Sequence, residues 1–150
     1  MAKPQIEKII DTGKIDLNIK KLSDRAKLPE LGINDSADLY SLKRYTIASN
    51  NITSVETGLS FDIPSGYLGI LEEDKDFALE NGLVIKTRIV YSGDKELRVL
   101  MQNASDYPVT LEVGTKIAQL IIFKLPKTNW NEVRKQTPQE DLKAEPKPTE

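Results

Sequence analysis

Short runs of alternating apolar and polar residues recur along this chain. They lie in residues 15–19, 53–62, 83–91, 97–101 and 109–113, and glycine, proline or aspartate separates most of them. Apolar side chains at every second position are typical of strands with one buried face. We therefore predict an all-β fold, an antiparallel β-barrel of the jelly-roll type.

The pattern divides the chain into three parts. Residues 1–13 are predicted to be an N-terminal arm, and residues 14–125 the β domain. In residues 126–150, a short helix is predicted at 130–134, and the proline, lysine and glutamate content from residue 136 predicts a solvated, disordered tail. A chain of 150 residues is long enough for one core, so we predict a single domain.

The composition of the chain excludes several classes of function. The net charge of −2 and the pI of about 5.4 argue against general nucleic-acid binding. Without cysteine or histidine, the chain has no disulfide framework, no thiolate metal site and no histidine base. The longest apolar run, residues 117–123, is too short to span a membrane, and the N-terminus lacks an apolar signal segment, so we predict a cytoplasmic protein without membrane contacts.

Residues 64–82 combine a backbone frame with a charged insertion. Pro64, Gly66 and Gly69 open the segment and Gly82 closes it, so that turn-forming residues define its path. The charged triplet 74–76, Asp-Lys-Asp, lies between them.

Three motifs resemble the trimeric deoxyuridine triphosphatase (dUTPase) family. They are P-x-G-Y-x-G at residues 64–69, A-D-L-Y-S at 37–41 and G-x-x-x-A-Q-L at 114–120. The resemblance implies a homotrimer with nucleotide sites between chains. It also implies that Asp38 holds nucleotide-bound magnesium through water and that Gln119 contacts the phosphates.

Other family positions differ. The residues at 74–76 replace the family's phosphate-binding Arg-Ser-Gly, Tyr91 takes the place of the tyrosine under the deoxyribose, and Arg88 stands where the catalytic aspartate is expected. No glycine occurs in residues 126–150, where the family has a glycine-rich arm. Since an arginine cannot act as a base and aspartates repel a triphosphate, we predict a catalytically inactive member.

The main hypothesis is therefore a pseudoenzyme that sequesters a nucleotide, such as a viral protein that binds a host cyclic-nucleotide signal in the host cytoplasm. Its predicted ligand-binding residues are Tyr91, Arg88, Lys75, Gln119 and Asp38. No cofactor is predicted, and magnesium is expected only together with a phosphate ligand.

Two alternatives remain. The trimer could be a protein-interaction or regulatory scaffold that uses residues 64–82 or the tail as its contact surface. Alternatively, the chain could be a divergent nucleotide hydrolase in which Glu96 is recruited as a replacement acid.

Overall fold

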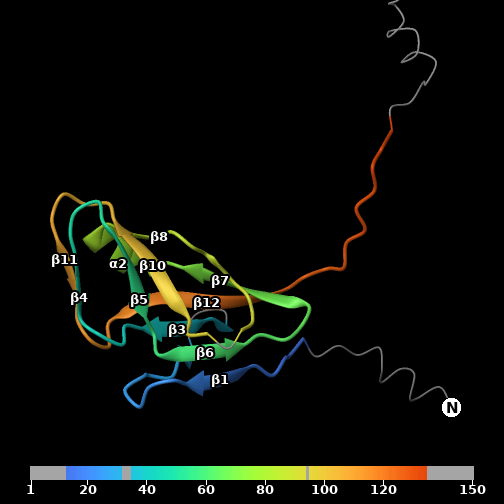
Figure 1. Cartoon of the computed structure of the whole chain (residues 1–150), viewed down its shortest axis with the longest axis horizontal. Coiled ribbons are helices and arrows are strands. Elements are labelled where there is room, and N and C mark those ends of the chain that lie inside the picture. The colour runs from blue at the N-terminus through green and yellow to red at the C-terminus, as the bar shows by residue number, and fades with distance from the viewer. Residues whose placement is uncertain (1–12, 32–34, 94, 135–150) are drawn as a thin grey trace, which may run out of the picture.

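The computed structural model describes residues 13–31, 35–93 and 95–134, and Figure 1 shows the arrangement of their strands. The strands are β1 (Asn18–Lys21), β2 (Glu30–Leu31), β3 (Ala37–Tyr40), β4 (Tyr45–Ile47), β5 (Ile52–Glu56), β6 (Leu59–Asp62), β7 (Tyr67–Glu72), β8 (Leu83–Ile85), β9 (Ile89–Val90), β10 (Arg98–Asn103), β11 (Val109–Leu111) and β12 (Lys116–Lys124). One helix, α2 (Lys75–Asn81), lies between β7 and β8 in the described part.

The strands pair into four sheets, and every pair is antiparallel. The largest sheet has the order β2-β3-β12-β7-β9, and a second has the order β5-β10-β8. Two further pairs, β1 with β6 and β11 with β4, complete the set. The predicted antiparallel all-β fold of jelly-roll type is confirmed, although the described strands form separate sheets rather than one closed barrel.

The core lies between these sheets and follows the predicted alternation. In β10, Val99 and Met101 are buried, whereas Arg98 is exposed. Other residues with almost no exposed surface are Leu39, Ile47, Val55, Leu59, Leu71, Leu83, Leu111, Ile117 and Leu120. The apolar positions of distant strands therefore meet in one cluster, as expected for a small β domain.

Helix α2 is the main element that the periodicity did not predict. The carboxylate of Asp74 accepts hydrogen bonds from the backbone N–H groups of Asp76 and Phe77, so Asp74 is the N-cap. Gly82 ends the helix in the left-handed conformation, with φ of 67°, and its N–H donates to the Ala78 carbonyl. The charged triplet is thus the start of a helix.

A buried asparagine connects two of the sheets. Asn103, at the end of β10, has 0% of its surface exposed. Its Nδ2 donates to the carbonyls of Ile47 and Tyr107, and its Oδ1 accepts from the N–H and hydroxyl of Ser105. One side chain therefore satisfies four polar groups at the corner between β10 and the β4-β11 pair.

The C-terminal segment differs from the prediction. Residues 125–134 leave the sheets as an exposed strand-free segment (Figure 1), and the predicted helix at 130–134 is wrong, because Trp130 is 90% exposed and no packing stabilises a single turn. Residues 1–12 and 135–150 lie outside the described residues, so the division into arm, domain and tail stays a prediction. Among the described residues, no helix has the length and apolar character needed to cross a membrane.

Candidate functional site

The outward face of the five-stranded sheet carries a row of polar residues. Gln119 in β12 pairs directly with Asp38 in β3 on one side and with Glu72 in β7 on the other. Glu30 in β2 extends the row, since it pairs with Asp38. Directly paired residues of antiparallel strands share a face, so these four side chains lie on one surface.

A β-bulge adds a lysine to this surface. Lys116 pairs with Tyr40 and Ala118 pairs with Leu39, so β12 has one extra residue at this point. Ile117 and Ala118 are consecutive and both buried, in agreement with this register shift. The bulge therefore places Lys116 on the same face as Gln119, although the two lie three positions apart.

Lys116 joins two carboxylates. Its Nζ lies 3.3 Å from Oδ1 of Asp38 and 3.3 Å from Oδ2 of Asp74, the N-cap of α2. Oδ1 of Asp38 is buried and accepts no hydrogen bond within the described ranges, so the ion pair is its polar contact. The result is a cluster of one cation and two anions at the edge of the polar row.

The electrostatics keep Lys116 and Asp74 ionised. Burial alone would lower the pKa of the Lys116 ammonium, but the carboxylates of Asp74 and Asp38 outweigh it and raise the pKa. Burial would likewise raise the pKa of Asp74, but the Phe77 N–H and the Lys116 ammonium lower it. Lys116 is therefore positively charged, and it balances the negative charge of Asp74.

Tyr40 forms one wall of the cluster. Its hydroxyl donates to Oε1 of Glu30 at 2.9 Å, and the Lys27 ammonium lies 3.9 Å from the centre of its ring. Burial and then the Glu30 carboxylate raise the pKa of Tyr40 to about 12. Tyr40 therefore stays a neutral hydrogen-bond donor beside Asp38 and Lys116.

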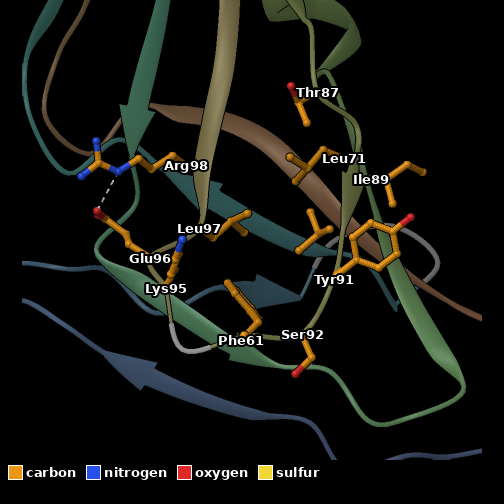
Figure 2. Close-up of a pocket in the computed structure, with 12 residues that line it drawn as sticks. Phe61, Leu71, Thr87, Ile89, Tyr91, Ser92, Lys95, Glu96, Leu97 and Arg98 are labelled. Atoms are coloured by element: carbon orange, nitrogen blue, oxygen red, sulfur yellow. Dashed lines mark ion pairs between the residues drawn. The ribbon is translucent and has the colours of Figure 1, made fainter.

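A concave region with a volume of about 650 Å³ is lined by residues 87, 89–93 and 95–98 together with Phe61 and Leu71. Figure 2 shows Phe61, Leu71 and Leu97 in its lining and the ring of Tyr91 at one side. Tyr91 is 73% exposed and can pack on a flat ligand group. We call this region the hairpin pocket.

Glu96 also lines the hairpin pocket but is committed to other contacts. Its Oε2 accepts the Gly58 N–H at 2.7 Å, and its Oε1 pairs with Nε of Arg98 at 3.2 Å. Figure 2 shows the carboxylate turned toward Arg98 and away from Tyr91. Glu96 therefore holds the backbone at Gly58.

Arg88 binds the residues that directly precede the charged triplet 74–76. Its Nη2 donates to both carboxylate oxygens of Glu73, at 2.9 and 2.7 Å, and its Nη1 donates to the Leu71 carbonyl. Glu73 also accepts the Ile85 N–H. Burial would raise the pKa of Glu73, but the Ile85 N–H and the Arg88 guanidinium outweigh it, so the pKa lies below its ordinary value of 4.5.

Replacing Arg88 with methionine is expected to lower the free energy of unfolding at pH 7 by about 1–2 kcal/mol, a value reduced for the partial exposure of Arg88. Because the folded-state pKa of Glu73 is depressed, its contribution is present above the ordinary pKa and is lost as the pH falls through the folded-state pKa. The difference between the variant and the wild type should therefore shrink below about pH 4. Urea unfolding at several pH values measures it.

Arg44→Met, which removes an exposed ion pair with Glu112, is the matched control and should change stability by less than about 1 kcal/mol. A difference for Arg88→Met that stays constant down to pH 3 would contradict the assigned role of Glu73.

The structure brings together only some of the predicted ligand-binding residues. Asp38 and Gln119 are direct neighbours on one face. Arg88 is bound to Glu73, Lys75 is exposed at the start of α2, and Tyr91 lies in the hairpin pocket. Sequence reasoning missed Lys116 and Glu72.

Comparisons with known proteins agree on one family. The dUTPase family model matches residues 24–149. The deoxyuridine 5'-triphosphate nucleotidohydrolase of Encephalitozoon cuniculi is 30% identical over 109 residues, which cover 71% of this chain and 76% of that protein. The fowlpox virus protein of the same name is 30% identical over 113 residues, covering 73% and 78%.

Solved structures show the same fold. The dUTPase of Staphylococcus bacteriophage 80alpha with dUpNHpp has a TM-score of 0.74 and 21% identity, covering 83% of this chain and 91% of that one. A variant dUTPase of phage phi11 of S. aureus, described with a structural Mg(II) ion, has a TM-score of 0.74 and 19% identity, covering 82% and 99%.

These relatives overturn the prediction of a non-catalytic pseudoenzyme that sequesters a cyclic nucleotide, because they are named as nucleotidohydrolases. The prediction rested on Arg88 in place of the catalytic aspartate, on the aspartates of the charged triplet 74–76 and on the missing glycine-rich arm. In the structure, Asp74 caps a helix and is paired with Lys116, and Arg88 is paired with Glu73. Asp74 therefore does not present the unpaired negative charge that the repulsion argument required.

Proposed function

The chain belongs to the dUTPase family, and from this premise we propose that it is a nucleotide hydrolase that releases pyrophosphate from a deoxynucleoside triphosphate, with dUTP as the leading substrate. The observation that carries the proposal is the group of Asp38, Lys116 and Gln119 on the outward face of the main sheet. A carboxylate, an ammonium and an amide on one surface suit a magnesium-bound phosphate chain.

Magnesium fits this site only as part of the substrate. No group of three or more acidic side chains that could hold a metal occurs in the ranges that the structure describes. Mg²⁺ is commonly held by one or two carboxylates plus substrate phosphates, and Asp38 offers one such carboxylate. Bound in this way, the ion would offset the phosphate charge.

Hydrolysis also needs a group that orients water and accepts its proton. Glu96, the acid expected for this role in the hydrolase alternative, is engaged by Gly58 and Arg98. Glu72 is 51% exposed, shares the outward face with Gln119, and has only a long ion pair of 3.7 Å with Arg88 in the described chain. We assign the water-orienting role to Glu72.

The substrate base would occupy the hairpin pocket, with Tyr91 packed against it. The pocket is lined by Leu71, whereas the next residue, Glu72, belongs to the opposite face of β7. The pocket and the polar row therefore lie on opposite faces of β7, and we propose that one nucleotide uses the pocket of one copy of the chain and the polar row of another. This arrangement supports the homotrimer with sites between chains as part of the proposal, and the cytoplasmic location stays a prediction.

The purified protein is expected to release pyrophosphate from dUTP with Mg²⁺ at a rate on the order of 10 per second, and to stop when EDTA removes the ion. A coupled pyrophosphate assay with dUTP, dCTP, dTTP, dATP and dGTP measures it and ranks the bases. Glu72→Gln should lower kcat about 100-fold or more, because the amide cannot accept a proton.

Glu112→Gln removes an exposed carboxylate outside the polar row and should leave kcat unchanged. Absence of pyrophosphate release from all five triphosphates would contradict the proposed function. Full activity in Glu72→Gln would contradict only the role of Glu72.

A further inference from the structure

One side of the hairpin pocket lies outside the paired strands. Residues 91–93 and 95–97, which line the pocket between β9 and β10, are called the pocket wall below. The two flanking strands belong to different sheets, because β9 pairs with β7 whereas β10 pairs with β5 and β8. In the described part of the chain, the first backbone–backbone hydrogen bond after β9 joins the Leu97 N–H to the Leu59 carbonyl. Strand pairing therefore does not fix the described wall residues that precede Leu97.

Side chains of β6 hold the middle of the pocket wall. The Ser60 hydroxyl donates to the Gly93 carbonyl at 3.1 Å, and the Ser92 hydroxyl donates to Oδ1 of Asp62 at 3.2 Å. Ser60 and Asp62 are two positions apart, so they lie on the same face of β6. Ser60 is 6% exposed, whereas Asp62 is exposed. Two consecutive wall residues are thus tied to one face of β6 by hydroxyl groups.

The end of the pocket wall is anchored by more bonds. Thr57, which is 1% exposed, donates its hydroxyl to the Leu97 carbonyl at 2.6 Å, and the Glu96 carboxylate accepts the Gly58 N–H at 2.7 Å. By contrast, Gly93 forms one hydrogen bond within the described ranges, and a Cβ added to it has open space around it. The wall is therefore fixed at Leu97 and depends on a single hydroxyl at Gly93.

We propose that Ser60 is a positioning residue for the substrate base, because its hydroxyl fixes the pocket wall at Gly93 and so sets the width of the hairpin pocket. The inference rests on the proposed function, which assigns the base to this pocket. Asp62 acts in the same way on the neighbouring residue, Ser92.

The width of the pocket bears on the choice between uracil and thymine, which differ by one methyl group. A single methyl group in an apolar pocket changes affinity about 10- to 200-fold, and only a wall that does not move aside can reject it. Since the Ser60 hydroxyl holds the wall from behind and does not line the pocket, it acts on the choice of base and not on the chemical step.

Titration calorimetry with dUMP and with dTMP tests this without requiring turnover. The wild type should bind dUMP more tightly than dTMP. Ser60→Ala should weaken dUMP binding about 3- to 10-fold, as expected for the loss of one neutral hydrogen bond, and should reduce the preference for dUMP over dTMP by a similar factor. Ser60→Thr keeps a hydroxyl and should retain the preference.

Steady-state assays add a second measurement. Ser60→Ala should raise KM for dUTP and leave kcat within about twofold of the wild type, which is the pattern expected when binding is lost equally from the ground state and the transition state. Loss of stability alone would leave the KM of the folded protein unchanged.

Asp62→Ala is the second variant if Ser60→Ala does not fold, because it releases Ser92 without changing the core or a residue that lines the pocket. It should also reduce the preference for dUMP. Ser49→Ala is the matched control, since it removes a hydroxyl that donates to the Ser105 carbonyl at 2.6 Å outside the pocket. It should bind both nucleotides as the wild type does, and urea unfolding checks each variant.

The outcomes separate the two proposals. A preference for dUMP that falls in Ser60→Ala and Asp62→Ala, in a protein that hydrolyses no triphosphate, would keep this inference and reject the proposed function. Hydrolysis of dUTP with wild-type KM and wild-type preference in both variants would do the reverse. No dUMP binding by the wild type, or variants that lose stability with an unchanged preference, would overturn the inference.

Discussion

Asp38→Asn is expected to lower kcat/KM for dUTP by about 100-fold or more, the loss expected when a preorganised charge is removed from a reacting phosphate. The carboxylate pairs with the Lys116 ammonium at 3.3 Å and is the group proposed to hold the magnesium-bound phosphates. Asparagine preserves the shape of the side chain but removes the charge that attracts the ion. Steady-state kinetics over a range of Mg²⁺ concentrations should show a weaker response to the metal.

The same substitution should change the melting temperature little, because it removes one ion pair and no apolar contact. Asp24→Asn, at an exposed loop position, is the matched control and should retain full activity. An Asp38→Asn protein with wild-type kcat/KM and metal dependence would show that Asp38 is only a structural partner of Lys116.

Asn103→Leu is expected to lower the free energy of unfolding by about 3–5 kcal/mol. Leucine has a similar size but leaves the Ile47 carbonyl and the Ser105 N–H without their side-chain partner, and the Tyr107 carbonyl keeps only the Ser105 hydroxyl. Each buried polar group that loses its partner costs about 1–3 kcal/mol. Urea denaturation should show a lower midpoint with an unchanged slope.

Gln102→Leu, at the partly buried neighbouring position on the other face of β10, is the matched control and should cost less than about 1 kcal/mol. A loss of less than about 1 kcal/mol in Asn103→Leu would mean that water replaces the side chain at these groups.

The alternating pattern predicted the strands well because burial on one face leaves a period of two in the sequence. Val99 and Met101 in β10 are buried as expected. The same period of two did not predict that Lys116 and Gln119 share a face, because in a regular strand residues 116 and 119 would lie on opposite faces. Only the bulge, which no residue pattern marks here, brings them together.

The sequence contains signals for helix α2 that the spacing of apolar residues does not show. Asp74 before the helix and Gly82 after it are typical capping residues. The charged triplet was instead interpreted by its formal charge, and this was one of the grounds for predicting an inactive protein. The effect of a charge depends on its partner, and the partner of Asp74 lies 42 positions away in the chain.

The bulge in β12 has a consequence for how this strand tolerates insertion and deletion. Before the bulge, an even-numbered residue faces outward, and after it an odd-numbered residue does so. Deleting Ile117 would restore a single parity and leave Lys116 outward, two positions before Gln119, while the core would lose the fully buried Ile117. The deletion should therefore keep the polar row intact and cost stability instead, as the loss of a buried isoleucine does.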